Sequence, residues 1–226
     1  MSVFSETVDW FGDSSHWHGD YGVPHFVLQH LGYTTETVAI SSAIAIPLGL
    51  WIGHTGRFRG VAVAFTGAMR ALPTLGVLTW IVLLVGIGLT APIIALIILA
   101  IPPLLAGAYS GLESVDRKTI DAARAIGMTE WQILAKVEVP LALPLIVGGI
   151  RSATLQVVST ATVAAYVGLG GLGRYLIDGL ALRDFPRMAA GSVLIIVIAL
   201  VLDGVFASLQ KIVVGGRASL NQATRS

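Results

Sequence analysis

Residues 168–173 fit a glycine pattern that binds dinucleotides in soluble enzymes. Gly168, Gly170 and Gly173 satisfy G-x-G-x-x-G, follow an apolar run and precede a plausible helix. A dinucleotide site also needs alternating strands and helices, and an acidic residue about twenty positions on. The sequence has neither, and the apolar run belongs to a membrane span. We interpret the glycines as a flexible turn, with a membrane-embedded nucleotide-binding redox protein as a distant alternative.

Other patterns with chemical potential are incomplete. Four histidines gather near the N-terminus: His16, His18, His25 and His30. They have no helical spacing and no carboxylate triad beside them, so we expect a solvated tail and no metal site. There is no cysteine, which rules out disulfides and thiolate metal sites. The chain has no Gly-rich loop ending in Gly-Lys-Ser/Thr, no G-x-S-x-G and no H-E-x-x-H. It therefore predicts no enzyme, no catalytic residues and no cofactor of its own.

The composition indicates a chain that lies mostly in lipid. It is 55% hydrophobic and 12% charged, whereas soluble domains carry about 25% charged residues. Such a chain has too little polar surface to cover a soluble core. The net charge of +1 gives no reason to expect a nucleic-acid partner.

Five apolar stretches are long enough to cross a bilayer, which takes roughly 20 residues. They predict an all-α membrane protein, a polytopic bundle of about five transmembrane helices. The stretches are residues 31–52, 60–85, 89–112, 141–167 and 188–214, the second interrupted by Arg70 and Pro73. We expect a polar tail over 1–30, one transmembrane domain over 31–214 with a polar segment at 113–140, and a tail over 215–226. The N-terminus lacks the basic start and apolar centre of a signal peptide.

Basic residues in the short loops predict the orientation, because they are enriched on the cytoplasmic side. With five spans, one side holds Arg57, Arg59, Arg117, Lys118, Arg124, Lys136, Lys211, Arg217 and Arg225, and the other holds Arg174, Arg183 and Arg187. Nine against three predicts a multi-pass protein of the cell membrane, with the N-terminus outside and the C-terminus in the cytoplasm.

The polar segment has the signals of two short helices at an angle. Residues 116–126 form a helical run, and Gly127 suits the left-handed position that ends a helix. Thr129 with Gln132 makes a capping-box pattern for a second helix, and we expect Pro140 to begin the fourth span. Small residues would let a partner surface approach closely: Ala122, Ala123 and Ala125. Trp131 is either a contact anchor or a packing residue.

The spacing of this segment resembles the coupling motif of ABC importer permeases, Glu-Ala-Ala, x3, Gly, x9, Ile-x-Leu-Pro. The chain has Asp121-Ala122-Ala123, three residues, Gly127, nine residues and Val137-Glu138-Val139-Pro140, with conservative departures at 121, 137 and 139. Further segments are similar to the osmoprotectant branch of these permeases: Gln29-His30-Leu31-Gly32, Leu72-Pro73-Thr74-Leu75, residues 137–144 with Gly149-Ile150-Arg151, and residues 168–173.

The resemblance implies the transmembrane subunit of a type I ABC importer for compatible solutes such as glycine betaine, choline or proline. It implies a second permease subunit, a separate ATPase that binds ATP, and an extracytoplasmic solute-binding protein. The ATPase would act on Asp121, Ala122, Ala123, Gly127, Trp131 and Pro140. The alternatives are a permease for another small polar solute, such as an amino acid, and a structural membrane subunit without a transport path.

Three charged residues fall inside the predicted spans: Arg70, Arg151 and Asp203. Arg70 lies eleven residues past Arg59 and Arg151 eleven past Pro140, about 16 Å each, and Asp203 lies about 12 Å before Lys211. Charges at such depth are expected to face the bundle or a cavity. We predict a charge network along the path, near Pro73 and Thr74, in which Asp203 pairs with Arg151 or Arg70. The alternative is that both arginines reach toward water.

Overall fold

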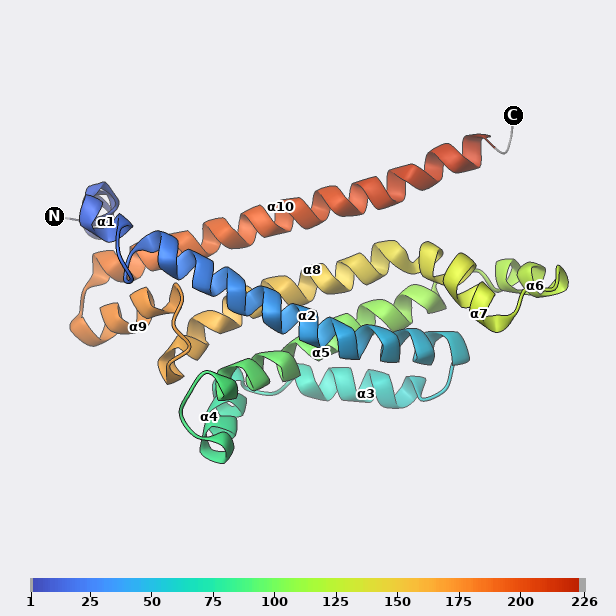
Figure 1. The fold of residues 1–226 in the computed structure, drawn as a ribbon, viewed down its shortest axis with the longest axis horizontal. Helices are drawn as coiled ribbons and strands as arrows, with labels where there is room; N and C mark the ends of the chain where they lie inside the picture. Colours follow the sequence, from blue (N-terminus) through green and yellow to red (C-terminus); the bar gives the residue numbers. More distant parts are fainter. Residues whose placement is uncertain (1, 224–226) are drawn as a thin grey trace. The chain divides into compact units, whose positions relative to one another are not determined.

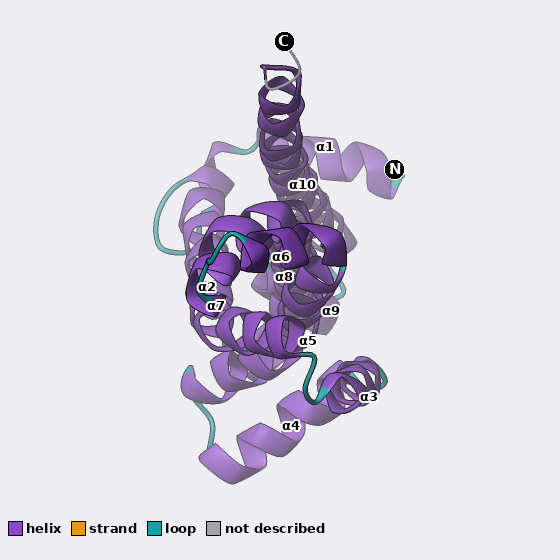
Figure 2. Cartoon of the chain, turned by 90° about the vertical axis from the view of Figure 1, so that its right-hand side faces the viewer, coloured by secondary structure: helices purple, strands orange, loops and turns teal. Residues whose placement is uncertain are grey.

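The computed structural model describes the backbone of residues 2–223 and the side chains of residues 2–214. Over this range the chain is helical and has no strand, as Figure 2 shows, so the predicted all-α fold is confirmed. The helices are α1 (Val3–Gly12), α2 (Val23–Thr55), α3 (Arg59–Arg70), α4 (Thr74–Val85), α5 (Thr90–Glu113), α6 (Arg117–Ala125), α7 (Glu130–Ile133), α8 (Val139–Ala164), α9 (Gly173–Leu182) and α10 (Phe185–Ala223).

Four helical stretches are long and apolar enough to cross a membrane: Val23–Thr55, Thr90–Glu113, Glu130–Val167 and Phe185–Val214. The pair α3 and α4 brings the number to five if it counts as one span, but it is bent by 92°. The predicted second span is therefore two short helices at an angle and not one continuous helix. Pro73 has no N–H to continue a helical ladder and disfavours a helical residue before it; it precedes α4 in an extended conformation.

Contacts divide the described chain into two units. The first contains the residues up to Ala39 together with Leu72–Ala100 and Thr154–Leu202, and the second contains Ile40–Ala71, Ile101–Ala153 and the residues from Asp203 on. Each unit has its own buried core, and α2, α5, α8 and α10 each contribute a stretch to both.

The core of the first unit is formed mainly by α4, α5 and α8. Leu96 of α5 and Val157 of α8 are each 1% exposed, and Leu78 of α4 joins the same cluster. Small alanines at the contact, among them Ala95 and Ala161, let the helix backbones approach closely, as is usual in membranes.

The N-terminal residues pack on the first unit, which corrects the predicted polar tail over 1–30. Trp10 of α1 is buried in a cluster with Phe26 and Tyr175, and its ring meets that of Tyr175 edge to face at 5.3 Å. The first span begins at Val23, well before Leu31. At the other end, the tail predicted from residue 215, with Arg217 and Arg225, lies outside the described side chains.

The glycine turn packs against α2 and follows a helix. Gln29 Oε1 accepts a hydrogen bond from the Gly171 N–H at 3.0 Å, and Gly171, at φ +69°, leaves only 3.2 Å between an added Cβ and His30 Nδ1. The preceding Thr154–Ala164 stretch is helical, so the strand needed for a dinucleotide fold is not there and the redox alternative is wrong. His30 itself is buried against the Val158 carbonyl, 3.0 Å from Nε2, so the predicted solvated histidine tail is wrong at this position.

The second unit is packed through glycines. Gly107 of α5 and Gly149 of α8 meet so closely that a Cβ on Gly107 would lie 2.7 Å from the Gly149 Cα. Any side chain at either position would push the two helices apart. Figure 1 shows α6 and α7 inserted between the end of α5 and the start of α8, so this tight helix pair carries the polar segment.

Candidate coupling site

The polar segment begins with a helix that ends where its sequence predicts. Asp116 caps α6 by accepting a hydrogen bond from the Lys118 N–H at 3.0 Å. Gly127 follows at φ +86°, and the Met128 N–H donates to the Ala123 carbonyl at 3.2 Å. A left-handed residue with such a bond is a common helix end, and glycine takes it without strain.

The second helix has the predicted capping box. Thr129 N–H donates to Gln132 Oε1 at 2.9 Å, and Gln132 N–H donates to Thr129 Oγ1 at 3.4 Å. After α7 the chain continues through a π-helical turn, Leu134–Glu138, directly into α8. The expectation that Pro140 begins the span is therefore wrong. Because Pro140 cannot donate a hydrogen bond to the preceding turn, the wider π turn takes up the irregularity and the helix goes on.

The inner face of this segment is apolar, and it includes a residue expected to face a partner. Ala123 is 6% exposed and packs with Ile120, Ile133 and Val115. Its small side chain permits close contact within the chain, which corrects the expectation that Ala123 faces a partner surface. The outward surface includes Asp121, Ala122, Ile126 and Trp131, the last 80% exposed.

An ion pair joins α6 to α7. Arg124 donates from Nε and Nη2 to the two oxygens of Glu130, at 2.9 and 3.1 Å. These hydrogen bonds raise the pKa of Arg124 above its ordinary value, and the forked geometry orients both side chains.

The end of α2 is attached to the same segment through His54, which the sequence analysis missed. His54 Nδ1 lies 2.5 Å from Oε2 of Glu138, a residue of the π turn that is 3% exposed. On the other side of the ring, Nε2 lies 3.4 Å from Glu130 Oε2. One side chain of α2 therefore contacts both the π turn and α7.

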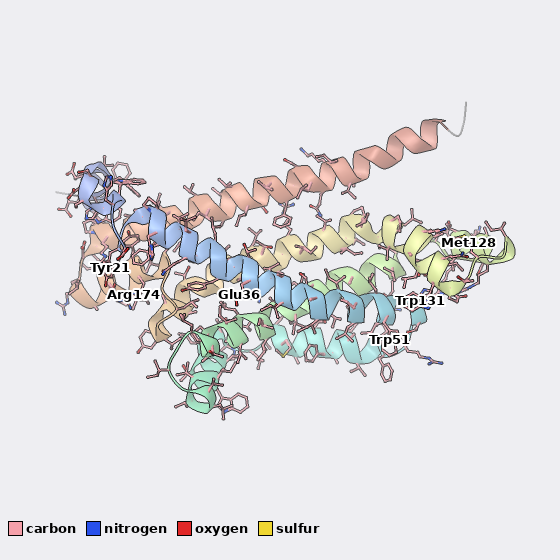
Figure 3. The ribbon with its side chains drawn as sticks, in the orientation of Figure 1. Tyr21, Glu36, Trp51, Met128, Trp131 and Arg174 are labelled. Carbon is pink, nitrogen blue, oxygen red and sulfur yellow. The ribbon has the colours of Figure 1, made fainter. Side chains whose placement is uncertain are left out.

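An apolar cavity of about 350 Å³ lies beside this contact. It opens between α2 and α7 and is lined by Pro47, Leu50, Trp51, His54, Glu130, Trp131 and Leu134. Figure 3 labels its two tryptophans, Trp51 on α2 and Trp131 on α7.

One of the predicted charge pairs forms within the second unit. Arg151 Nε and Nη2 donate to the carboxylate of Asp203 at 2.6 and 2.7 Å. Gln210 extends the contact, accepting from Arg151 Nη1 at 3.1 Å and donating to the Pro144 carbonyl at 3.1 Å. Both charged side chains stay about one-third exposed in the isolated chain.

Arg70 is not part of that pair. It is the last residue of α3, it is exposed, and it has no ion pair or hydrogen bond within residues 2–214. Pro73 and Thr74 lie just beyond it, at the bend before α4. Within residues 2–214, Asp203 therefore pairs with Arg151 and not with Arg70.

These features define a multi-pass helical membrane protein with an exposed polar segment between α5 and α8. The chain belongs to the family of binding-protein-dependent transport system inner membrane components, whose model matches residues 45–215. It is therefore the transmembrane, non-enzymatic subunit of an ABC importer.

Two relatives from Bacillus subtilis are similar over most of their length. The chain is 32% identical to the glycine betaine/carnitine/choline transport system permease protein OpuCB over 81% of this chain and 84% of that protein. It is 31% identical to the choline transport system permease protein OpuBB, again over 81% of this chain and 84% of that protein.

Solved structures share the fold. One is an inward-facing form of the MetNI methionine ABC transporter, with a TM-score of 0.74 and 24% identity over 83% of this chain and 94% of that one. Another is an amino acid ABC transporter with histidines, with a TM-score of 0.61 and 20% identity over 94% of this chain and 97% of that one.

Gly127 provides a test of the turn between α6 and α7. Gly127→Val places a β-branched residue at φ +86° and should cost about 1–2 kcal/mol of local stability. We expect insertion to persist while solute uptake and stimulated ATP hydrolysis fall several-fold in the assembled transporter. Gly127→Asn is the matched control, because asparagine tolerates this conformation and nothing lies within 4 Å of an added Cβ. Equal activity of the two variants would show that the turn is not needed.

Asp203 provides a test of the charge pair. Asp203→Asn should lower the melting temperature in detergent by about 2–4 °C, since Arg151 loses its carboxylate partner. Adding Arg151→Gln should restore part of the loss, and a double-mutant cycle measures the coupling. Arg70→Gln should show no coupling to Asp203, and Asp20→Asn controls for loss of an exposed acid. A coupling of zero between Asp203 and Arg151 would refute the pair.

Proposed function

We propose that this chain forms the membrane path for a compatible solute that carries a quaternary ammonium group, such as glycine betaine or choline. The observation that carries the proposal is the 32% identity to OpuCB over 84% of that protein's length. A relative of Salmonella typhimurium, the osmoprotectant import permease protein OsmW, is 33% identical over 80% of this chain. The likeness to amino acid transporters, below 25% identity, supports the fold and does not favour an amino acid.

The proposed assembly contains a second permease subunit, an ATPase subunit that binds ATP, and an extracytoplasmic solute-binding protein. The Lys and Arg distribution supports a cytoplasmic coupling segment and an external N-terminus. ATP-driven closure of the ATPase would then press on the outward surface of α6 and α7, including Asp121, Ala122 and Trp131. The contact of His54 with Glu138 would pass this displacement to α2.

Uptake by the reconstituted complex tests the proposal. The chain is purified with its copurifying subunits, placed in proteoliposomes, and supplied with ATP and the solute-binding protein. We expect ATP-dependent accumulation of labelled glycine betaine or choline and none of methionine or histidine. Accumulation of an amino acid alone would overturn the proposed substrate class, and the absence of any solute uptake with intact ATP hydrolysis would favour a structural subunit.

A further inference from the structure

Glu36 is a carboxylate within the first membrane span, and the sequence analysis overlooked it. It lies on α2 (Figure 3) and its side chain is exposed. It is thirteen residues beyond Val23, the first residue of α2, or about 20 Å along the helix. Its neighbours Tyr33 and Val38 pack against the same core as Ala95. Glu36 is thus level with apolar core residues of the first unit.

This carboxylate has no partner in the described part of the chain. Glu36 makes no ion pair and no hydrogen bond within residues 2–214. Asp203, in contrast, accepts two hydrogen bonds from Arg151. An ionised carboxylate is strongly disfavoured against lipid, and acids inside spans face a wet cavity or a positive charge. In the assembled transporter, the exposed side of α2 at Glu36 must therefore face one of these.

The surface around Glu36 leaves room for a ligand. Gly32, one turn before it, has nothing within 4 Å of an added Cβ, and Thr35 and Ala39 on the same side are small and exposed. Tyr33 is three residues away, a spacing at which helical side chains are neighbours. A carboxylate next to an aromatic ring suits a quaternary ammonium group, which has no N–H to donate and is recognised through its charge and its methyl surface.

We propose that Glu36 is a specificity-determining residue of the solute path and attracts the trimethylammonium group of the solute. The inference rests on the proposed function and adds to it the charge that selects the solute. Choline carries a net positive charge, whereas the carboxylate of glycine betaine cancels that of its ammonium group. A fixed carboxylate should therefore favour choline more strongly than glycine betaine.

Transport by the assembled complex with Glu36→Gln tests the inference. We expect ATP-dependent choline uptake to fall about tenfold, the lower end of the effect of a charge-focusing site, and glycine betaine uptake to change less than about threefold. Glu36→Asp should keep most choline uptake because the charge remains. Asp20→Asn, which removes an exposed acid before α2, should behave as the unaltered transporter. Copurification of the subunits and the melting temperature are measured for each variant.

The possible results separate this inference from the proposed function. If the unaltered complex carries neither choline nor glycine betaine, the proposed function fails and the inference with it. If the unaltered complex carries choline and Glu36→Gln carries it equally well, only the inference fails. If Glu36→Gln loses its partner subunits, Glu36 is a subunit contact and the inference is overturned. If the intact complex loses uptake of both solutes equally, Glu36 does not select between them and the inference is also overturned. A selective loss of choline uptake in an intact complex supports it.

Discussion

The contact between His54 and Glu138 is the interaction on which the polar segment of this chain depends. Glu138 is almost fully buried in the π turn, and its carboxylate is 2.5 Å from an imidazole nitrogen of α2. Removing one partner of a buried hydrogen bond leaves the other group unsatisfied at a cost of about 1–3 kcal/mol, so each of the two residues holds the other in place. The end of the first span and the coupling segment are therefore held together although they lie 84 residues apart in the chain.

Rigid local features surround this contact. The capping box starts α7, the left-handed Gly127 ends α6, and the forked Arg124–Glu130 pair joins the two helices. The close approach of Gly107 and Gly149 fixes α5 against α8, the two helices from which the segment emerges. In the proposed mechanism, these contacts would pass a displacement of α6 and α7 to the helices of the second unit.

Local signals in the sequence predicted much of this site, but its long-range contacts could not be predicted from the sequence. The helix end at Gly127 and the Thr129–Gln132 box depend on residues at most five positions apart, so their patterns are readable. His54 and Glu138 meet only through the fold, and a single sequence offers no signal that pairs them. Ala123 was placed on the wrong face because small size fits a tight internal contact as well as an external one. Glu36 was missed although it is an acidic residue within an apolar stretch. Pro73 was predicted to interrupt one span, whereas the structure has two helices at a large angle there.

The number of solute molecules imported per ATP hydrolysed, measured in proteoliposomes with His54→Gln, tests most directly whether this contact transmits the coupling movement. The account predicts that ATP hydrolysis continues while the ratio falls at least about fivefold, the lower range of coupling energies between sites. Thr55→Ala, at the next residue of the same helix end, should leave the ratio unchanged. An unaltered ratio in a stably assembled His54→Gln complex would contradict the account.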